Sequence, residues 1–207
     1  GNEGQAANRL YSQPGHVDLF SIGSPATSKN ALTVGASRSN RTTGGYSQLT
    51  YAQAWPANFP DPPIGTENVS GNCDGMAAFS SRGLCLDRRI KPDVVAPGTD
   101  VVSTKSSRAP LRNFWGSYPG NAQYAYMGGT SMAAPFVSGC AALVREYYVK
   151  DCNHQPSAAL LKATLINSTK WLAGIDAVAN HPDLPNHHQG FGCIYMPWAI
   201  PNLSEPN

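Results

Sequence analysis

The stretch from Gly128 to Pro135, which reads Gly-Gly-Thr-Ser-Met-Ala-Ala-Pro, constrains the fold of this 207-residue chain more than any other. Its serine, Ser131, stands between two glycines and an uncharged, largely apolar segment, residues 133–144. Thr130 and Ser131 are favoured N-cap residues, and Pro135 fits the first turn of a helix, where its missing N–H costs nothing. We therefore expect Ser131 at the start of a helix that is apolar nearly all round and hence buried.

The start of a buried helix is an unusual place for a hydroxyl group. Free N–H groups and the positive end of the helix dipole can stabilise an oxyanion beside Ser131. The two preceding glycines, Gly128 and Gly129, have no side chain, so a substrate backbone can approach them closely. Taken alone, a serine in this position is more often a simple helix cap, and the whole string decides between the two interpretations.

The composition limits the classes of protein to which the chain can belong. Charged residues make up 14% of it and the formal net charge is +2, which is too mild to indicate nucleic acid or a membrane surface as partner. No apolar run approaches the length of a membrane span. Its 20 glycines and 17 prolines are dispersed, as in a loop-rich globular domain. We expect one domain, residues 1–207, with one substantial core.

Short apolar stretches alternate with helical patterns along the chain. Beyond the central helix, Ser157 is expected to cap a second helix that extends to about Ile166. Residues 37–75 are too long for one loop, so we expect them to contain small strands. The pattern indicates an α/β fold with a parallel sheet. Strands are predicted where apolar stretches are bounded by turn residues, at 31–36, 77–80, 92–98 and 101–103, and residues 125–127 lead into the Gly128–Pro135 stretch.

The chain has five cysteines, none of them in a CxxC pair that would indicate zinc. Cys140 falls within the expected central helix and should be a buried free thiol. The other four are expected to form two disulfides, Cys73–Cys85 and Cys152–Cys193, in a secreted protein. Four N-x-S/T sequons give modest support to secretion, with their asparagines at Asn40, Asn68, Asn167 and Asn202.

The eight residues from Gly128 to Pro135 resemble the nucleophile motif of the subtilisin-like serine proteases, the subtilases. Residues 124–129, with Phe114-Trp115 before them, are similar to the oxidation-stable alkaline proteases of bacilli and their fungal relatives. The similar segments together extend from residue 1 to about residue 192. Three further stretches resemble other parts of the family in the right order, at 21–36, 79–83 and 91–98.

The resemblance implies a three-layer subtilisin-like α/β fold with a mostly parallel sheet and a buried central helix that starts at the nucleophile. Residues 1–207 would then be the C-terminal portion of a single subtilase catalytic domain. In this family a serine attacks the peptide bond and forms an acyl-enzyme, and the catalytic triad occurs in the chain order Asp, His, Ser.

The resemblance also implies roles for individual residues. Ser131 matches the catalytic nucleophile. Asn2 matches the asparagine whose side-chain N–H forms the oxyanion hole together with the backbone N–H of the nucleophile. Gly23-Ser24-Pro25 is similar to the wall and floor of the pocket for the residue before the scissile bond, with a cis peptide before the proline. A glycine there leaves the pocket open to large apolar or aromatic side chains. The expected substrate-binding residues are Gly23, Ser24, Gly128 and Gly129.

The base and the carboxylate that a serine nucleophile needs do not occur here in their family setting. The family's histidine lies in an H-G-T-H-type string and its aspartate in a D-x-G string, both upstream of the oxyanion asparagine. That asparagine is residue 2 here, so we expect a truncated chain that holds the nucleophile and the oxyanion hole, lacks the base, and is inactive alone. The five histidines all lie in expected loops or in the tail: His16, His154, His181, His187 and His188.

The leading interpretation is a secreted, extracellular serine endopeptidase. Its partners would be protein or peptide substrates, which lie extended and pair with exposed strands, and the upstream part of the same catalytic domain. The alternative is a pseudoprotease or peptide-binding module without catalysis. A purely structural α/β domain would require the motifs to be a coincidence. No nucleic acid, membrane, metal site or chemical cofactor is expected; structural calcium is common in the family, but the sequence shows no clear ligands for it.

Overall fold

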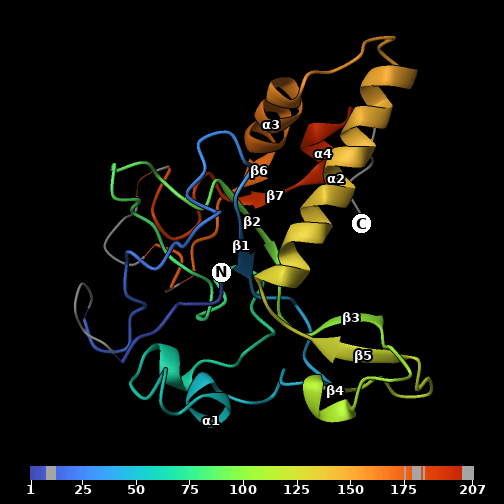
Figure 1. Ribbon diagram of the computed structural model, residues 1–207. Coiled ribbons are helices and arrows are strands. Elements are labelled where there is room, and N and C mark those ends of the chain that lie inside the picture. The colour runs from blue at the N-terminus through green and yellow to red at the C-terminus, as the bar shows by residue number, and fades with distance from the viewer. Residues whose placement is uncertain (8–12, 175, 179–182, 184, 202–207) are drawn as a thin grey trace.

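A four-stranded sheet forms the centre of the computed structural model, which describes residues 1–7, 13–174, 176–178, 183 and 185–201. Its strand order is β1-β2-β7-β6, formed by Val34–Ser37, Val94–Pro97, Cys193–Ile194 and Thr169–Lys170. The first three strands are parallel and β6 is antiparallel to β7. The long helix α2, Thr130–Lys150, crosses one face of this sheet (Figure 1). The predicted α/β fold with a mostly parallel sheet is confirmed.

Alternation along β2 explains why the sheet is covered on both faces. Val94 and Ala96 point to the core that contains α2, whereas Val95 points to a smaller cluster on the other side. Successive strand residues face opposite ways, so a strand buried on both faces must be apolar at consecutive positions, as β2 is. The smaller cluster is formed by Met76, Val95, Leu172 and Ala177.

Helix α2 is buried on one face only. Its buried apolar residues recur at helical spacing and pack on the sheet side: Ala133, Val137, Cys140 and Val144. On the opposite face Phe136 is 56% exposed and Leu143 is 51% exposed. The prediction of a helix buried nearly all round is therefore wrong for this chain, although its apolar sequence is as expected. No helix among the described residues combines the length and apolar character needed to cross a bilayer.

A second, antiparallel sheet forms a lobe below the N-terminal end of α2 (Figure 1). Its order is β3-β5-β4, formed by Val101–Thr104, Tyr124–Met127 and Gly116–Ser117. A short 3₁₀ turn, η2, Leu111–Asn113, precedes β4. Strand β5 leads directly through Gly128 and Gly129 into α2, as the sequence predicted. The lobe therefore lies next to the start of the helix.

The remaining helices are shorter than α2. Helix α3, Ala158–Asn167, is capped by Ser157, whose Oγ accepts a hydrogen bond from the Leu160 N–H at 3.1 Å, so this predicted cap is confirmed. Three short elements complete the fold: α1, Tyr51–Ala54; η1, Ile64–Thr66; and α4, Met196–Ala199. Helix α3 packs against α2 and α4.

Two local predictions and the disulfides differ from the structure. The small strands expected in residues 37–75 are replaced by α1 and η1, and residues 77–80 form a turn closed by the Ser80 N–H and the Ala77 carbonyl at 3.0 Å. All five cysteines are free thiols, so the predicted pairs Cys73–Cys85 and Cys152–Cys193 are wrong. Cys152 lies beyond the end of α2 whereas Cys193 lies within the sheet. Cys140 is free and buried, as predicted.

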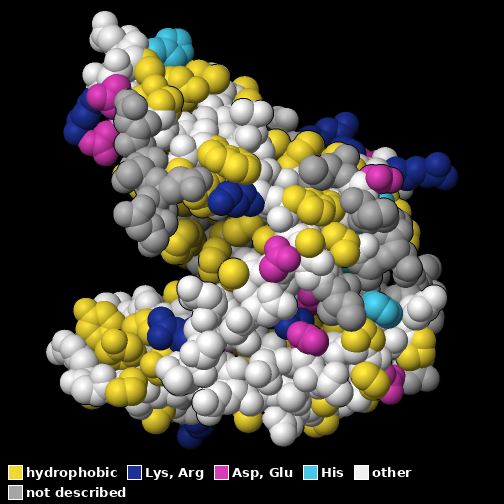
Figure 2. Space-filling model, turned by 180° about the vertical axis from the view of Figure 1, so that it is seen from behind, with side chains coloured by type: hydrophobic (Ala, Val, Ile, Leu, Met, Phe, Trp, Pro, Cys, Tyr) yellow, Lys and Arg dark blue, Asp and Glu magenta, His cyan; other side chains and the backbone are white. Residues whose placement is uncertain are grey.

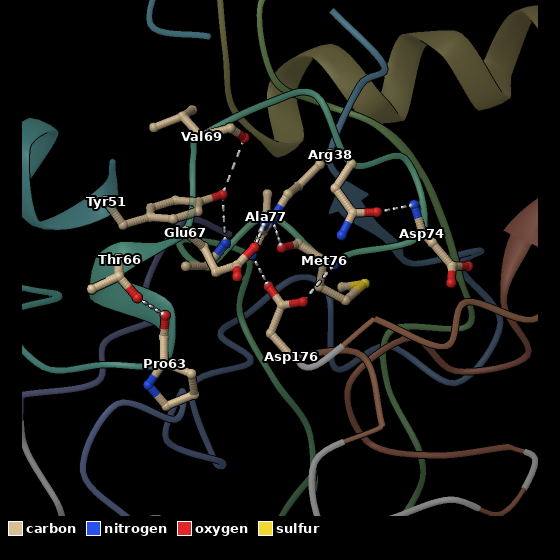
Figure 3. Close-up of polar contacts among 12 residues, drawn as sticks. Arg38, Tyr51, Pro63, Thr66, Glu67, Val69, Asp74, Met76, Ala77 and Asp176 are labelled. Carbon is tan, nitrogen blue, oxygen red and sulfur yellow. Dashed lines mark hydrogen bonds and ion pairs between the residues drawn. The ribbon is translucent and has the colours of Figure 1, made fainter. Parts of the chain in front are cut away.

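A buried arginine connects distant parts of the chain behind the sheet (Figure 3). The guanidinium of Arg38 contacts the carboxylate of Asp176 at 3.1 Å and that of Glu67 at 2.8 Å. Asp176 also accepts a hydrogen bond from the Met76 N–H at 3.1 Å. Burial disfavours the charge on this guanidinium, but Asp176, Tyr51 and Glu67 together outweigh the effect of burial and raise its pKa. Arg38 thus ties the end of β1 to two loops more than 25 residues away in the sequence.

Removing one member of the buried pair should destabilise the fold strongly. We expect Asp176→Ala to lower the free energy of unfolding by about 3 kcal/mol or more, because it leaves a buried guanidinium short of a partner. Urea denaturation measures the change. Asp87→Ala is the control: its pair with Arg89 is solvent-exposed and should contribute far less to stability than the buried pair. Equal losses in the two variants would contradict the structural role of Asp176.

Candidate active site

The start of α2 is fixed by a contact between two glycines. The N–H of Gly129 donates a hydrogen bond to the carbonyl of Gly98, just beyond β2, at 2.7 Å. A Cβ on Gly98 would lie 2.6 Å from the Cβ of Ala36 and 2.9 Å from the Gly129 carbonyl oxygen. Gly129 has φ = 140°, a conformation that residues with side chains rarely adopt. The helix can begin here only because both positions lack a side chain.

Gly129 is the N-cap of α2, and Thr130 and Ser131 are its first helical residues. The predicted N-cap is therefore displaced by one residue. Pro135 was predicted in the first turn of the helix, but it lies in the second turn. At this position it leaves the carbonyl of Ser131 without its helical donor, because proline has no N–H.

Asn2 is held against the start of the helix by its side-chain oxygen. Its Oδ1 accepts hydrogen bonds from both the N–H and the Oγ1 of Thr130, each at 2.9 Å. The amide orientation follows from these two donors, so the Nδ2 group points away from Thr130. Within the described part of the chain, neither this Nδ2 nor the N–H of Ser131 has a hydrogen-bond acceptor. Two free donors therefore lie beside an exposed serine hydroxyl.

The Ser131 hydroxyl has no base beside it. No hydrogen bond joins Ser131 to a histidine or a carboxylate in the residues that the structure describes. The backbone N–H of His154 donates a hydrogen bond to the carbonyl of Tyr148 near the far end of α2, about 25 Å along the helix from Ser131. His181 is outside the described residues, as is the sequon at Asn202.

Residues 79–82 position two of the predicted site segments. At one end, the Phe79 carbonyl accepts a hydrogen bond from the Gly4 N–H at 2.9 Å, and the Ser81 N–H donates to the Gly1 carbonyl at 3.0 Å. At the other end, the Arg82 carbonyl accepts from the Ser21 N–H at 2.9 Å. Asn2 therefore lies between Phe79 on one side and the segment leading to Gly23 on the other.

The predicted pocket segment has the expected backbone. The Ser24–Pro25 peptide is cis, as predicted. At Gly23, a Cβ would meet nothing within 4 Å, so the space in front of this glycine is open. Gly128 is different: a Cβ there would lie 1.9 Å from the indole ring of Trp115, so the ring packs directly on the glycine backbone.

Sequence reasoning missed several residues that shape the site. Gly98 ends the segment 91–98 that resembles the family, yet only the structure shows why this position must be a glycine. Thr130 appeared as a possible cap, but it anchors Asn2, which lies 128 residues away. The aromatic residues near Gly128 also went unassigned, because they come from separate loops.

A deep notch separates α2 from the lobe of β3, β4 and β5 (Figure 2). Hydrophobic side chains gather along the wall of the notch on the side of α2. This agrees with the exposure of Phe136 and Leu143 on the helix.

Comparison with known proteins gives consistent results. A model of the subtilase family matches residues 1–192. Serine protease AprX of Bacillus subtilis is 32% identical over 127 residues, which are 61% of this chain and 23% of AprX. Pyrolysin of Pyrococcus furiosus is 35% identical over 156 residues, which are 74% of this chain and 10% of pyrolysin. The chain therefore spans less than a quarter of either relative.

Among solved structures, the CspB protease of Clostridium perfringens is similar in fold. It aligns with a TM-score of 0.54 at 24% sequence identity, covering 87% of this chain and 28% of that protein. At this identity the likeness supports the fold alone.

The glycine contact at the helix start can be tested with a matched pair of substitutions. Gly98→Ala should lower the free energy of unfolding by about 1–3 kcal/mol, because the new methyl group has no space. Gly139→Ala, in the exposed part of α2 where nothing lies within 4 Å, should leave stability unchanged or raise it by up to about 1 kcal/mol. Thermal unfolding followed by circular dichroism compares them. The same effect in both variants would show that the contact at Gly98 has no special role.

Proposed function

The chain belongs to the subtilase family, and we propose that it forms the nucleophile-bearing part of a serine endopeptidase that hydrolyses peptide bonds through an acyl-enzyme on Ser131. Serine protease function is general to the family; the roles of individual residues are our proposal. The observation that carries it is the anchoring of Asn2 by Thr130, which leaves an amide donor free beside the serine.

In the proposed reaction, Ser131 Oγ attacks the carbonyl carbon of the scissile peptide. The oxygen of that carbonyl becomes negatively charged and accepts hydrogen bonds from Asn2 Nδ2 and the Ser131 N–H. Fixed donors of this kind stabilise the transition state because they need no reorganisation when the charge develops. The N-terminal end of α2 adds the positive end of its dipole. Gly129 would leave room for the substrate backbone, whereas Trp115 takes the space beside Gly128. Gly23 and Ser24 would contact the residue before the scissile bond.

We propose that the general base and its orienting carboxylate come from an upstream part of the same catalytic domain. A serine hydroxyl is a weak nucleophile without an adjacent base, and none contacts Ser131 among the described residues. Two observations support an upstream partner: the exposed apolar face of α2, and the small share of each relative that this chain spans. Large exposed apolar patches mark surfaces that another part of a protein covers.

A peptide-binding module without catalysis is the second candidate. One observation favours it, namely that no base lies beside Ser131 in the described chain. Such a module would use the same free donors to bind a peptide carbonyl without cleaving it.

Secretion and the placement of the chain in the oxidation-stable branch of the family are further parts of the proposal. The three sequon asparagines that the structure describes, Asn40, Asn68 and Asn167, are exposed, as glycosylation requires. The proposed acyl transfer uses protein groups alone. Structural calcium remains an expectation from the family; no group of three or more His, Cys, Asp or Glu side chains in the described ranges is arranged to hold a metal ion.

The source of the base can be tested by comparing two proteins. A protein that includes the upstream Asp and His strings should react with a fluorophosphonate at Ser131, and Ser131→Ala should abolish both labelling and peptide cleavage. The 207-residue chain alone should react barely, because losing the serine–histidine partnership lowers kcat by on the order of 10⁶ in subtilisin, a member of this family. In-gel fluorescence measures labelling.

Ser138→Ala is the matched control, because Ser138 is an exposed serine on the same helix whose loss should leave labelling intact. If the longer protein contains both strings and yet shows no labelling or cleavage that depends on Ser131, the protease proposal fails. The peptide-binding module then takes its place.

The proposed oxyanion donor is tested separately in the longer, active protein. Asn2→Ala should lower kcat by about 10²–10³, a magnitude taken over from the side-chain donor of subtilisin, with little change in KM. Thr130→Val is the comparison: it removes one anchor of Asn2 and keeps the backbone anchor, so its kcat should fall less. A kcat for Asn2→Ala within threefold of the parent would exclude Asn2 from the oxyanion hole.

A further inference from the structure

An aromatic pocket lies directly beside Asn2. It is a cavity of about 240 Å³ whose walls are mainly aromatic rings and glycine backbone. This is smaller than the roughly 300–1,000 Å³ of sites for drug-sized ligands, and suits a single side chain. We use the name aromatic pocket for the cavity lined by Asn2, Gly4, Trp55, Asn58, Phe59, Phe79, Trp115, Gly128 and Gly129.

The rings of the pocket support one another. Trp115 lies 5.6 Å from Trp55 and 6.1 Å from Phe79, measured between ring centroids. Tyr46 stacks on Trp115 at 4.9 Å with only 4° between the planes. Gly128 backs the indole of Trp115 so closely that no side chain could fit between them. The walls are therefore held in place before a ligand arrives, which lowers the entropy cost of binding.

The position of the pocket relative to Asn2 indicates which substrate residue it meets. Phe79 lines the pocket, whereas Arg82, three residues on, holds the segment that leads to Gly23. Asn2 lies between them, since its neighbours Gly1 and Gly4 bond to Ser81 and Phe79. If Gly23 faces the residue before the scissile bond, the aromatic pocket faces a residue after it.

The chemistry of the walls selects the kind of side chain. Among the described residues, the lining has two amide side chains, Asn2 and Asn58, besides the indole N–H groups, and it has no acidic or basic residue. A charged side chain would lose its hydration there without a partner of opposite charge. An aromatic or large aliphatic side chain would instead contact ring faces and edges on several sides.

We propose that the aromatic pocket binds a large apolar or aromatic side chain on the leaving-group side of the scissile bond, and that Trp115 and Trp55 determine this specificity. The inference rests on the proposed function, because it takes Asn2 and Ser131 as the reaction centre. It adds a second selective site, separate from the open space at Gly23.

Acyl transfer in the longer, active protein tests the preference. The acyl-enzyme formed from an ester substrate is partitioned between water and an added amino-acid amide, whose side chain occupies the leaving-group side. Phenylalaninamide and leucinamide should capture the acyl group at least about tenfold better than glycinamide, aspartamide or lysinamide, the range expected for an apolar pocket. A preference for lysinamide or for the small glycinamide would overturn the proposal.

Two variants connect the preference to the pocket. Trp115→Leu should reduce the ratio of phenylalaninamide to glycinamide capture by about tenfold. Asn58→Phe should reduce it as well by filling the half-buried rim, and serves if the tryptophan variant fails to fold. Trp198→Leu is the matched control, because Trp198 is 56% exposed on α4 and does not line the pocket. Unchanged ratios in both pocket variants would overturn the role of the aromatic pocket.

A binding measurement separates this inference from the proposed catalysis. In the longer protein with Ser131→Ala, Trp171→Phe and Trp198→Phe, the tryptophans retained within residues 1–207 are those of the pocket, Trp55 and Trp115, and any upstream tryptophan is also replaced by Phe. The Kd of phenylalaninamide, measured from the change in tryptophan fluorescence, should be at least about tenfold lower than that of glycinamide. If this binding is seen and Ser131 is unreactive in the parent, the pocket stands and the protease proposal fails. If Ser131 is reactive and the two amides bind equally, the pocket proposal fails alone.

Discussion

The hydrogen bond from Gly129 to Gly98 is the contact on which the rest of the site depends. It joins the end of a central strand to the start of α2 at a point where Gly98 has no room for a Cβ and Gly129 has a backbone conformation that residues with side chains rarely adopt. Because the helix begins there, Thr130 can present both of its donors to Asn2, and Ser131 occupies the first turn. The position of every group in the proposed reaction centre follows from this close approach of two backbones.

The core is complete around the sheet and incomplete around the helix. Strand β2 buries consecutive apolar residues on two faces, and the Arg38–Asp176 pair closes the side away from α2. Helix α2 buries only the stripe that faces the sheet. The same apolar composition thus has two outcomes, because burial depends on which neighbours are present as well as on the sequence of the element.

Local patterns predicted the elements well and the long-range contacts poorly. The strand at 92–98 and the cap at Ser157 follow from short stretches, the cis peptide before Pro25 follows from the resemblance to the subtilases, and the structure has all three. Helix α2 formed as predicted, but its burial was wrong because exposure is set by packing partners. The disulfide prediction failed for a similar reason, since sequence spacing does not show whether two cysteines meet. The contact of Asn2 with Thr130, like the convergence of Trp55, Phe79 and Trp115, arises only when distant loops fold together. The catalytic roles remain predictions.

The anchoring of Asn2 through its oxygen has a consequence for chemical ageing. Hydrolysis of this side-chain amide, which adds water and releases ammonia, would convert it to an aspartate that keeps an oxygen where Thr130 needs an acceptor. The stability of the fold would change little, because the acceptor for Thr130 is retained. The outward-facing group, however, would change from an N–H donor to a negatively charged oxygen, at the place where the proposed reaction accumulates negative charge. A single slow hydrolysis would therefore abolish the proposed activity and leave the fold and its stability intact.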